Sequence, residues 1–329
     1  MRFPQNISFL APAALVALLA CACNASEPHA ATTAADPPAA AAQASKTWPS
    51  AAPPAAQTGG FDGPKAYAQV AKLVGFGPRP PGSPAIAQAQ AYIQSQLTGF
   101  GCKVDTDDFH APTPVGDLPM KNIVAKIPGT GQGIILLLTH YDTLRLDGFV
   151  GAEDGGSSTG LMLEMARLLC AGKPQANAVW IAFLDGEEAQ VRWTDTDSVY
   201  GSRELAARMA VSGDLKRTHA VILADMVGQY DLRIPRETSS TTWLTNLVWK
   251  KAAELGYQNV FVSSDNAVSD DHGPFLHRGV PATDIIDLND YIEMGNWHTT
   301  HDTLDKVSAY SLAVVGHVIL ESVNELQKG

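Results

Sequence analysis

Short apolar runs alternate with helical patterns through most of the chain, and this alternation limits the possible folds more than any other feature of the sequence. Several runs lack the apolar and polar alternation of a half-exposed sheet, so we expect strands that are buried on both faces, as in a parallel sheet covered by helices. The predicted strands are Asn122–Lys126, Gly133–Thr139, Ala178–Leu184, Ala220–Ala224 and Ala282–Asp287.

Helical patterns with a one-sided apolar stripe fill the segments between these strands. The start of the first helix is marked by Ser83, a good N-cap, and by Pro84 at the first helical position. The predicted helices are Pro84–Leu97, Ser157–Leu169, Ser202–Val211, Thr241–Leu255 and Ser308–Leu326. Strands that alternate with helices in this way predict a three-layer α/β/α sandwich around a mixed, mostly parallel central sheet.

The start of the chain carries an export pattern. Arg2 precedes the apolar run Phe9–Ala20, which is shorter than the about 20 residues that cross a bilayer and fits the apolar core of a signal peptide. A small residue, Ala20, directly precedes Cys21, and this pattern resembles a bacterial lipobox. We therefore expect lipidation at Cys21, with ordinary signal cleavage nearby as the alternative. Residues 1–21 are therefore the predicted export signal of a periplasmic or cell-envelope lipoprotein, or of a secreted protein.

Residues 22–58 consist mainly of Ala, Pro, Thr and Ser. Such a segment has too little apolar surface to offset the entropy of folding, so we expect a disordered tether there. Residues 59–329 show no internal repeat and no further break in composition, and we expect them to form one domain.

The formal net charge of -11 argues against a nucleic-acid partner, because binding to a phosphate backbone depends on Lys and Arg. Contact with a membrane is expected only through a lipid on Cys21. Two cysteines, Cys102 and Cys170, lie within the predicted domain. Their spacing alone leaves open whether they form a disulfide or remain free thiols.

Side chains able to bind a metal follow successive predicted strands. They are His140 and Asp142, the segment Asp185–Glu188, and Asp225; further groups are Glu153–Asp154, Asp270–His272 and His298. Ligand sites in open α/β sheets form outside the carboxyl ends of the strands, so we expect these groups to meet. Zinc binds imidazole nitrogen and carboxylate oxygen, and a catalytic zinc keeps one position open. Adjacent side chains diverge, so of Glu187 and Glu188 one can ligate zinc while the other acts as a general base.

In order and spacing these residues resemble the zinc aminopeptidases, over most of the domain from about Phe76. A closer resemblance is to the animal-type glutaminyl cyclases of the same metallopeptidase superfamily. The segments that carry it are Arg79–Pro84, Phe149–Asp154, Gly186–Arg203, Asp270–Leu276, Arg278–Pro281 and Trp297–His298. The resemblance implies a zinc exopeptidase-like fold and an enzyme that acts on the N-termini of peptides or proteins.

The same resemblance implies a role for each site residue. The implied ligands of one zinc ion per chain are Asp154, Glu188 and His298. Glu187 would be the general acid and base, with Asp225 and Asp270 in an acidic hydrogen-bonded network beside it. Trp193 and Trp297 would line the substrate pocket. The implied reaction closes an N-terminal Gln to pyroglutamate and releases ammonia. No residue of the segment Asp287–Asn296 could be matched to the pocket phenylalanine of the cyclases.

An aminopeptidase is the main alternative. In that enzyme His140 and Asp225 would hold a second zinc ion, with Asp154 bridging both, and Glu187 would activate water. The ligands for both readings are present, so the loop of Trp193 and the position of Trp297 decide in favour of the cyclase. A non-catalytic binding lipoprotein is less favoured because no zinc ligand or base has been lost.

Overall fold

The computed structural model describes residues 48–328. The predicted export signal at 1–21, with Cys21, and the predicted tether over 22–47 lie outside the described residues. The packed chain begins before the expected boundary at residue 59. Trp48 packs edge-on against Tyr310 with ring centroids 5.3 Å apart, and its Nε1 donates a hydrogen bond to Ser311 Oγ at 3.1 Å. A single large aromatic residue in the Ala/Pro-rich segment therefore extends the domain.

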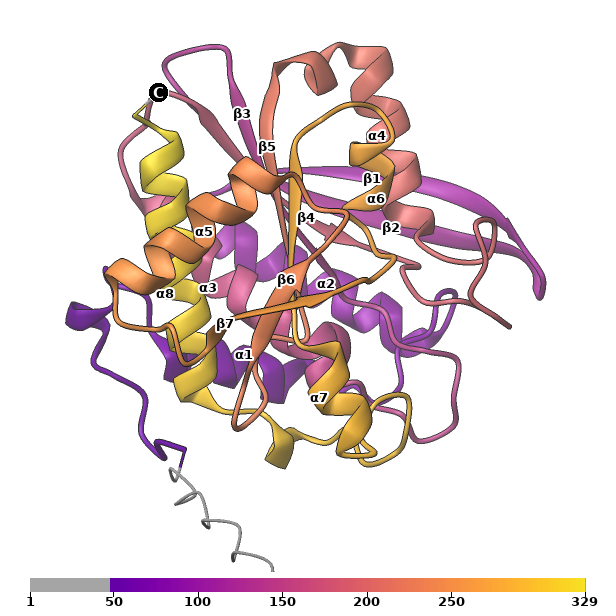
Figure 1. Cartoon of the computed structure of the whole chain (residues 1–329). Coiled ribbons are helices and arrows are strands. Elements are labelled where there is room, and N and C mark those ends of the chain that lie inside the picture. Colours follow the sequence, from indigo (N-terminus) through magenta and orange to yellow (C-terminus); the bar gives the residue numbers. More distant parts are fainter. Residues whose placement is uncertain (1–47, 329) are drawn as a thin grey trace, which may run out of the picture. The chain divides into compact units, whose positions relative to one another are not determined.

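A six-stranded mixed sheet forms the centre of the fold, with strand order β1-β2-β4-β3-β5-β8. Strands β4, β3, β5 and β8 run parallel, whereas β1 and β2 form an antiparallel hairpin at one edge. Their bounds are β1 Lys103–Thr113, β2 Gly116–Ile127, β3 Ile134–His140, β4 Ala178–Leu184, β5 Thr218–Asp225 and β8 Ala282–Ile286. A separate pair of parallel strands consists of β6 Ile234–Glu237 and β7 Phe261–Asn266. The prediction of a mixed, mostly parallel sheet is confirmed (Figure 1).

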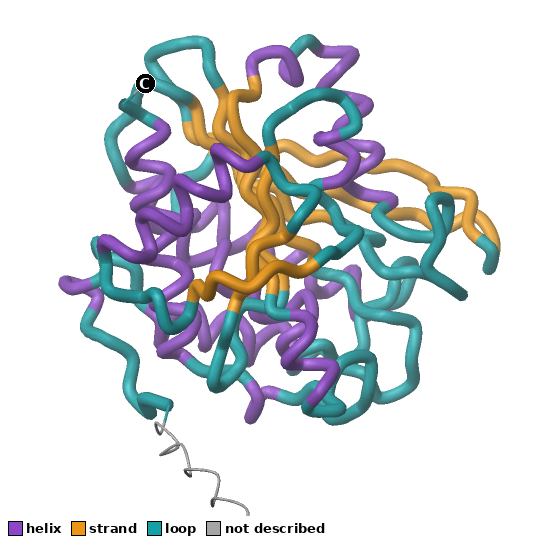
Figure 2. The backbone as a smooth tube through the Cα atoms, in the orientation of Figure 1, coloured by secondary structure: helices purple, strands orange, loops and turns teal. Residues whose placement is uncertain are grey.

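Helices cover both faces of this sheet. Figure 2 shows them in purple, in the orientation in which Figure 1 labels them. The longer helices are α1 Gly63–Val74, α2 Pro84–Gly99, α3 Ser158–Ala171, α4 Tyr200–Ser212, α5 Thr242–Glu254 and α8 Ala309–Leu326. Two short ones are α6 Gly273–Leu276 and α7 Leu288–Glu293. The start of α2 confirms the predicted cap, because Ser83 Oγ accepts a hydrogen bond from the backbone N–H of Ile86 at 3.1 Å.

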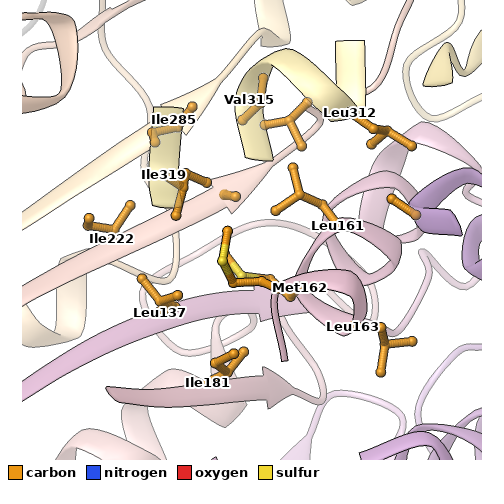
Figure 3. Packing of buried hydrophobic residues seen from close by; sticks show 14 of the residues in the cluster. Leu137, Leu161, Met162, Leu163, Ile181, Ile222, Ile285, Leu312, Val315 and Ile319 are labelled. Atoms are coloured by element: carbon orange, nitrogen blue, oxygen red, sulfur yellow. The ribbon is translucent and has the colours of Figure 1, made fainter. Parts of the chain in front are cut away.

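Alternate residues of each central strand supply two separate cores. Leu137 joins the larger core with α3 and α8, whereas its neighbours Leu136 and Leu138 join the core under α4 and α6. Figure 3 shows the larger core, in which side chains from neighbouring strands of the sheet pack against side chains of α3 and α8. The labelled side chains are Leu137, Ile181, Ile222 and Ile285 from the sheet and Leu161, Met162, Leu163, Leu312, Val315 and Ile319 from the helices. Burial on both faces explains the continuous apolar runs in the sequence.

Cys102 and Cys170 form a disulfide that joins the start of β1 to the end of α3 across 68 residues of sequence. This settles the alternative that the spacing left open. Replacing both cysteines with Ser is expected to lower the free energy of unfolding by about 2–4 kcal/mol, because the unfolded chain regains the freedom of a closed loop. Urea denaturation of the oxidised protein and of the double variant measures the difference. An unchanged free energy of unfolding in the double variant would contradict the prediction.

Within the described residues, no helix is both long enough and apolar enough to cross a membrane.

Candidate active site

The predicted metal-binding side chains meet at the carboxyl edge of the parallel strands. His140 ends β3 and Asp225 ends β5, while Glu187 and Glu188 lie in the turn that follows β4. Parallel strands bring these chain ends to one edge of the sheet. Asp154 reaches the same place from the irregular turn that opens α3, where Gly155 has the positive φ of 74° that a left-handed turn requires.

Two groups of metal-binding atoms share Asp154. In the first group, His298 Nε2 lies 3.3 Å from Asp154 Oδ2 and 3.4 Å from Glu188 Oε1. In the second, His140 Nε2 lies 3.3 Å from Asp154 Oδ1 and 3.1 Å from Asp225 Oδ1. The potential ligand atoms of each group lie within 4.8 Å of one another. The structure therefore brings together both predicted ligand sets, the three residues of the single zinc site and the pair of the second site.

Buried oxygens without hydrogen-bond partners show that the first group fits a cation. Both carboxylate oxygens of Glu188 and Oδ2 of Asp154 are buried and accept no hydrogen bond within the described part of the chain. Burial, reinforced by Asp154, raises the pKa of the Glu188 carboxyl to about 7. An unpaired buried carboxylate is costly, so these oxygens are suited to a positive charge between them. Their combination with an imidazole nitrogen matches the ligand preference of zinc.

The backbone that carries Asp154 is held by residues some distance away in the sequence. Asp302 accepts hydrogen bonds from the backbone N–H groups of Glu153 at 2.8 Å and Asp154 at 3.1 Å. Arg79 is fully buried and donates to the carbonyl oxygens of Val150 at 2.7 Å and Gly151 at 3.1 Å, just before this turn. These contacts fix the direction in which Asp154 points.

Asp142 holds the adjacent glutamates in the same manner. Its carboxylate accepts hydrogen bonds from the backbone N–H groups of Glu187 at 3.1 Å and Glu188 at 3.3 Å, and it lies 3.4 Å from His140 Nδ1. One carboxylate thus connects the turn after β4 with the histidine at the end of β3. Asp142 thus places a carboxylate beside the ring nitrogen of His140 that faces away from the second ligand group.

His298 adopts a left-handed backbone conformation with φ 52°. The indole of Trp297 stacks on its imidazole, with centroids 3.9 Å apart and planes at 20°. A left-handed residue other than Gly costs about 1–3 kcal/mol and is typical of functional sites. The strained turn directs the imidazole toward Asp154 and Glu188 while placing Trp297 beside it.

A pocket of about 260 Å³ opens directly over the first group of ligands. Glu187, Asp225 and Asp270 face it, and Trp193 and Trp297 contribute to its wall. Burial raises the pKa of Glu187 well above its usual range; His140 opposes this shift and Asp270 adds to it. Burial likewise raises the pKa of Asp270, and Asp225 reinforces that effect. Ionisable groups with strongly shifted pKa values in a cleft are typical of catalytic sites.

Three comparisons with known proteins agree on the family. The model described as Peptidase family M28 matches residues 122–323. A glutaminyl-peptide cyclotransferase of Bothrops jararaca is 32% identical over 289 residues, which cover 75% of this chain and 78% of that protein. A solved glutaminyl cyclase from an Acidobacteriales bacterium has 41% sequence identity and a TM-score of 0.77, with 82% of this chain and 95% of that chain covered.

This chain belongs to peptidase family M28, among its glutaminyl-peptide cyclotransferases. The fold alone does not separate cyclases from peptidases in this family. A solved Zn-dependent exopeptidase from Parabacteroides distasonis has 28% sequence identity and a TM-score of 0.72, with 79% of this chain and 97% of that chain covered. The neighbours agree with the donor chemistry in indicating a zinc cofactor, whereas the number of zinc ions has to be argued from the site.

In this M28 domain, the apolar lining of the pocket is the part that sequence reasoning missed. The additional apolar lining residues are Met226, Ala267, Val268, Ile286 and Leu288. Ile286 ends β8 and Leu288 begins α7, so Leu288 is the part of this wall that comes from the segment in which no pocket phenylalanine could be matched. The sequence signal that could have found them is closeness to a predicted site residue: Met226 follows Asp225, and Val268 lies two residues before Asp270.

Proposed function

We propose that this M28 family member converts the N-terminal Gln of peptides or proteins to pyroglutamate and releases ammonia. The observation that carries the proposal is the pocket in which Glu187, a buried zinc-type ligand set and two tryptophans lie together. Cyclases named as such among its relatives support the same reaction. The apolar and aromatic wall suits the flat side chain of Gln, with the polar groups gathered at its base.

The reaction is an intramolecular aminolysis. The α-amino nitrogen of the substrate forms a bond to its own side-chain amide carbon, and the bond from that carbon to the amide nitrogen breaks. Glu187 accepts the proton that the attacking amine loses and donates a proton to the departing nitrogen, which leaves as ammonia. A zinc ion held by Asp154, Glu188 and His298 would polarise the amide carbonyl as a Lewis acid. Asp225 and Asp270 face the pocket with Glu187, and the negative charge of Asp270 adds to the effect of burial in raising the pKa of Glu187.

One zinc ion per chain is part of the proposal, because the attacking nitrogen belongs to the substrate and no activated water is needed. The alternative is a two-zinc aminopeptidase, and the second ligand group supports it: His140, Asp154 and Asp225 lie close enough to hold an ion. The pocket favours the cyclase. Trp193 and Trp297 line the pocket that contains the first ligand group, and their flat aromatic faces suit one small, flat side chain.

A direct assay separates these functions. The purified domain is incubated with a Gln-initiated peptide while ammonia release is followed, and separately with a Leu-anilide, and zinc is counted per chain. Ring closure with one zinc ion supports the proposal. Hydrolysis of the Leu-anilide with two zinc ions contradicts it and supports the aminopeptidase. Absence of both activities contradicts both enzymes and supports a binding role.

Turnover is expected to rise toward mildly alkaline pH. The attacking α-amine has to be neutral, and its ordinary pKa of about 7.7–8.0 leaves most of it protonated below pH 7. The value of kcat/KM should therefore increase as pH rises through that range. A pH profile with a Gln-initiated peptide checks this, and a maximum below pH 6 would rule out the neutral-amine scheme.

We also propose export, with a lipid anchor at Cys21 or, alternatively, secretion. The disulfide between Cys102 and Cys170 supports an oxidising compartment, such as the periplasm or the cell surface. A Cys21→Ser variant is expected to move the protein from the membrane fraction to the soluble exported fraction. An unchanged distribution would contradict the anchor.

A further inference from the structure

Trp193 is a pocket residue whose own side chain does little to hold it in place. The loop runs from the end of β4 to α4, and the Trp193 side chain remains 38% exposed. Its indole forms no hydrogen bond to any residue that the structure describes. A half-exposed aromatic side chain at the mouth of a pocket needs a well-ordered backbone to keep one position.

Asp197 supplies that order from four residues further along. Its Oδ1 accepts hydrogen bonds from Gln190 N at 2.9 Å and from the Tyr200 hydroxyl at 2.8 Å. Its Oδ2 accepts from Val191 N at 3.0 Å and Arg192 N at 2.9 Å. Three consecutive backbone N–H groups immediately before Trp193 therefore converge on one carboxylate.

The carboxylate is suited to this role in both position and charge. Asp197 is only 4% exposed. Burial alone would raise its pKa, but the hydrogen bonds from Arg192 and Gln190 outweigh it and hold the pKa below its usual range. Each oxygen of Asp197 accepts two hydrogen bonds. An asparagine at this position would have an NH2 group in place of one of these oxygens, and that group would face two donors whichever way the amide rotated. The four contacts therefore require an acid.

The two ends of the loop are fixed independently of Asp197. Backbone N–H groups of Val199 and Tyr200 donate to the carbonyl oxygens of Glu187 and Gly186, each at 2.7 Å. At the start of the loop, Arg145 donates to Gln190 Oε1 at 2.8 and 3.1 Å. Loss of the Asp197 contacts would consequently loosen the arc around Trp193 while Glu187 and Glu188 remain attached to Asp142.

We infer that Asp197 is a positioning residue that holds Trp193 in the pocket wall before the substrate arrives. The inference rests on the proposed function, since it assigns Trp193 to substrate binding. If the pocket wall is already formed, substrate binding does not have to order it. If Trp193 is mobile, the apparent affinity for the substrate falls in proportion to the fraction of time that the wall is in place. Asp197 should thus affect KM and leave the chemical step nearly unchanged.

The test compares Asp197→Asn with Asp195→Asn, an exposed aspartate of the same loop whose side chain makes no hydrogen bond within residues 48–328. We expect Asp197→Asn to raise KM for a Gln-initiated peptide by about tenfold, as for a wall in place about a tenth of the time, with kcat and zinc content nearly unchanged. Asp195→Asn should match the unaltered protein. A fall in kcat with loss of zinc would overturn the inference, because Asp197 would then act through Glu188.

A double-mutant cycle identifies the partner through which Asp197 acts. In a Trp193→Ala background, Asp197→Asn should leave KM within about twofold, because no indole remains to be held. If the separate effects of Trp193→Ala and Asp197→Asn on KM multiply in the double variant, the inference is overturned. Tyr200→Phe removes one of the four donors and keeps the acid, so it should shift KM in the same direction by a smaller factor; it serves if Asp197→Asn folds poorly.

Hydrogen exchange separates this inference from the function on which it rests. Asp197→Asn should speed amide exchange at Gln190, Val191 and Arg192, and Asp195→Asn should not. Unchanged exchange at these amides overturns the positioning role even in an active enzyme. Absence of ring closure by the unaltered protein overturns the proposed function, and the exchange result then still decides whether Asp197 holds the loop.

Discussion

A Glu187→Gln variant is expected to lose about 10²–10⁴-fold in kcat with Gln-initiated peptides, the usual contribution of a positioned general acid and base. Gln is close to Glu in size, and the backbone contacts of this position to Asp142 and Val199 do not involve the side chain. The pocket and its zinc ligands should therefore keep their geometry. Steady-state kinetics gives kcat, and metal analysis of the same sample should show the zinc content of the unaltered protein.

Glu188→Gln is the matched control for that experiment. It makes the same chemical change one residue away, where the side chain belongs to the metal-binding group with Asp154 and His298. This variant should lose zinc as well as turnover. Turnover retained by Glu187→Gln would remove Glu187 from the proton transfers, and loss of zinc from that variant would assign it a ligand role instead.

The parts of the fold that the sequence predicted are those with burial on both faces. Strands such as β3 and β4 are continuous apolar runs, and His140 at the end of β3 and Asp185 directly after β4 mark the carboxyl edge without any knowledge of the topology. Strand β1 was missed because it is polar: its residues from Lys103 to Asp108 are largely charged, as suits an edge strand that pairs with β2 alone. Apolar patterns therefore reveal buried strands, including the buried edge strand β8, better than polar strands such as β1.

The residues of the site likewise divide into those that the sequence predicted and those that it did not. Zinc-type ligands could be predicted because each follows a recognisable strand or turn, whereas their supports could not. Arg79 lies far from Asp154 in the sequence and reaches its turn only through the folded loop. The apolar wall formed by Val268 and Leu288 depends equally on tertiary packing. Such residues are ordinary in sequence and become functional only by the position that the sheet gives them.

Removal of the metal should abolish turnover and destabilise the domain together. Without a cation, Glu188 and Asp154 keep buried oxygens that no hydrogen bond satisfies. Zinc at about a thousandfold excess over its Kd contributes about 4 kcal/mol to the folded state, which corresponds to roughly 10 °C in Tm for a domain of this size. Dialysis against a chelator, followed by activity measurement and calorimetry, tests both effects. An unchanged Tm and full activity after removal would contradict a zinc-dependent site.

Adding zinc back to the metal-free protein then distinguishes the one-metal cyclase from the two-metal alternative. Turnover and Tm should both recover at one equivalent per chain, because the proposed reaction uses only the ligand group that contains His298. His298→Ala should bind no catalytic zinc and stay inactive at any concentration, whereas His140→Ala should still bind one equivalent. Recovery that requires two equivalents, or loss of half of the bound zinc in His140→Ala, would show that Asp154 bridges two ions. The shared position of Asp154 makes this comparison decisive, since both groups need its carboxylate, whereas His298 belongs to the first group alone and His140 to the second alone.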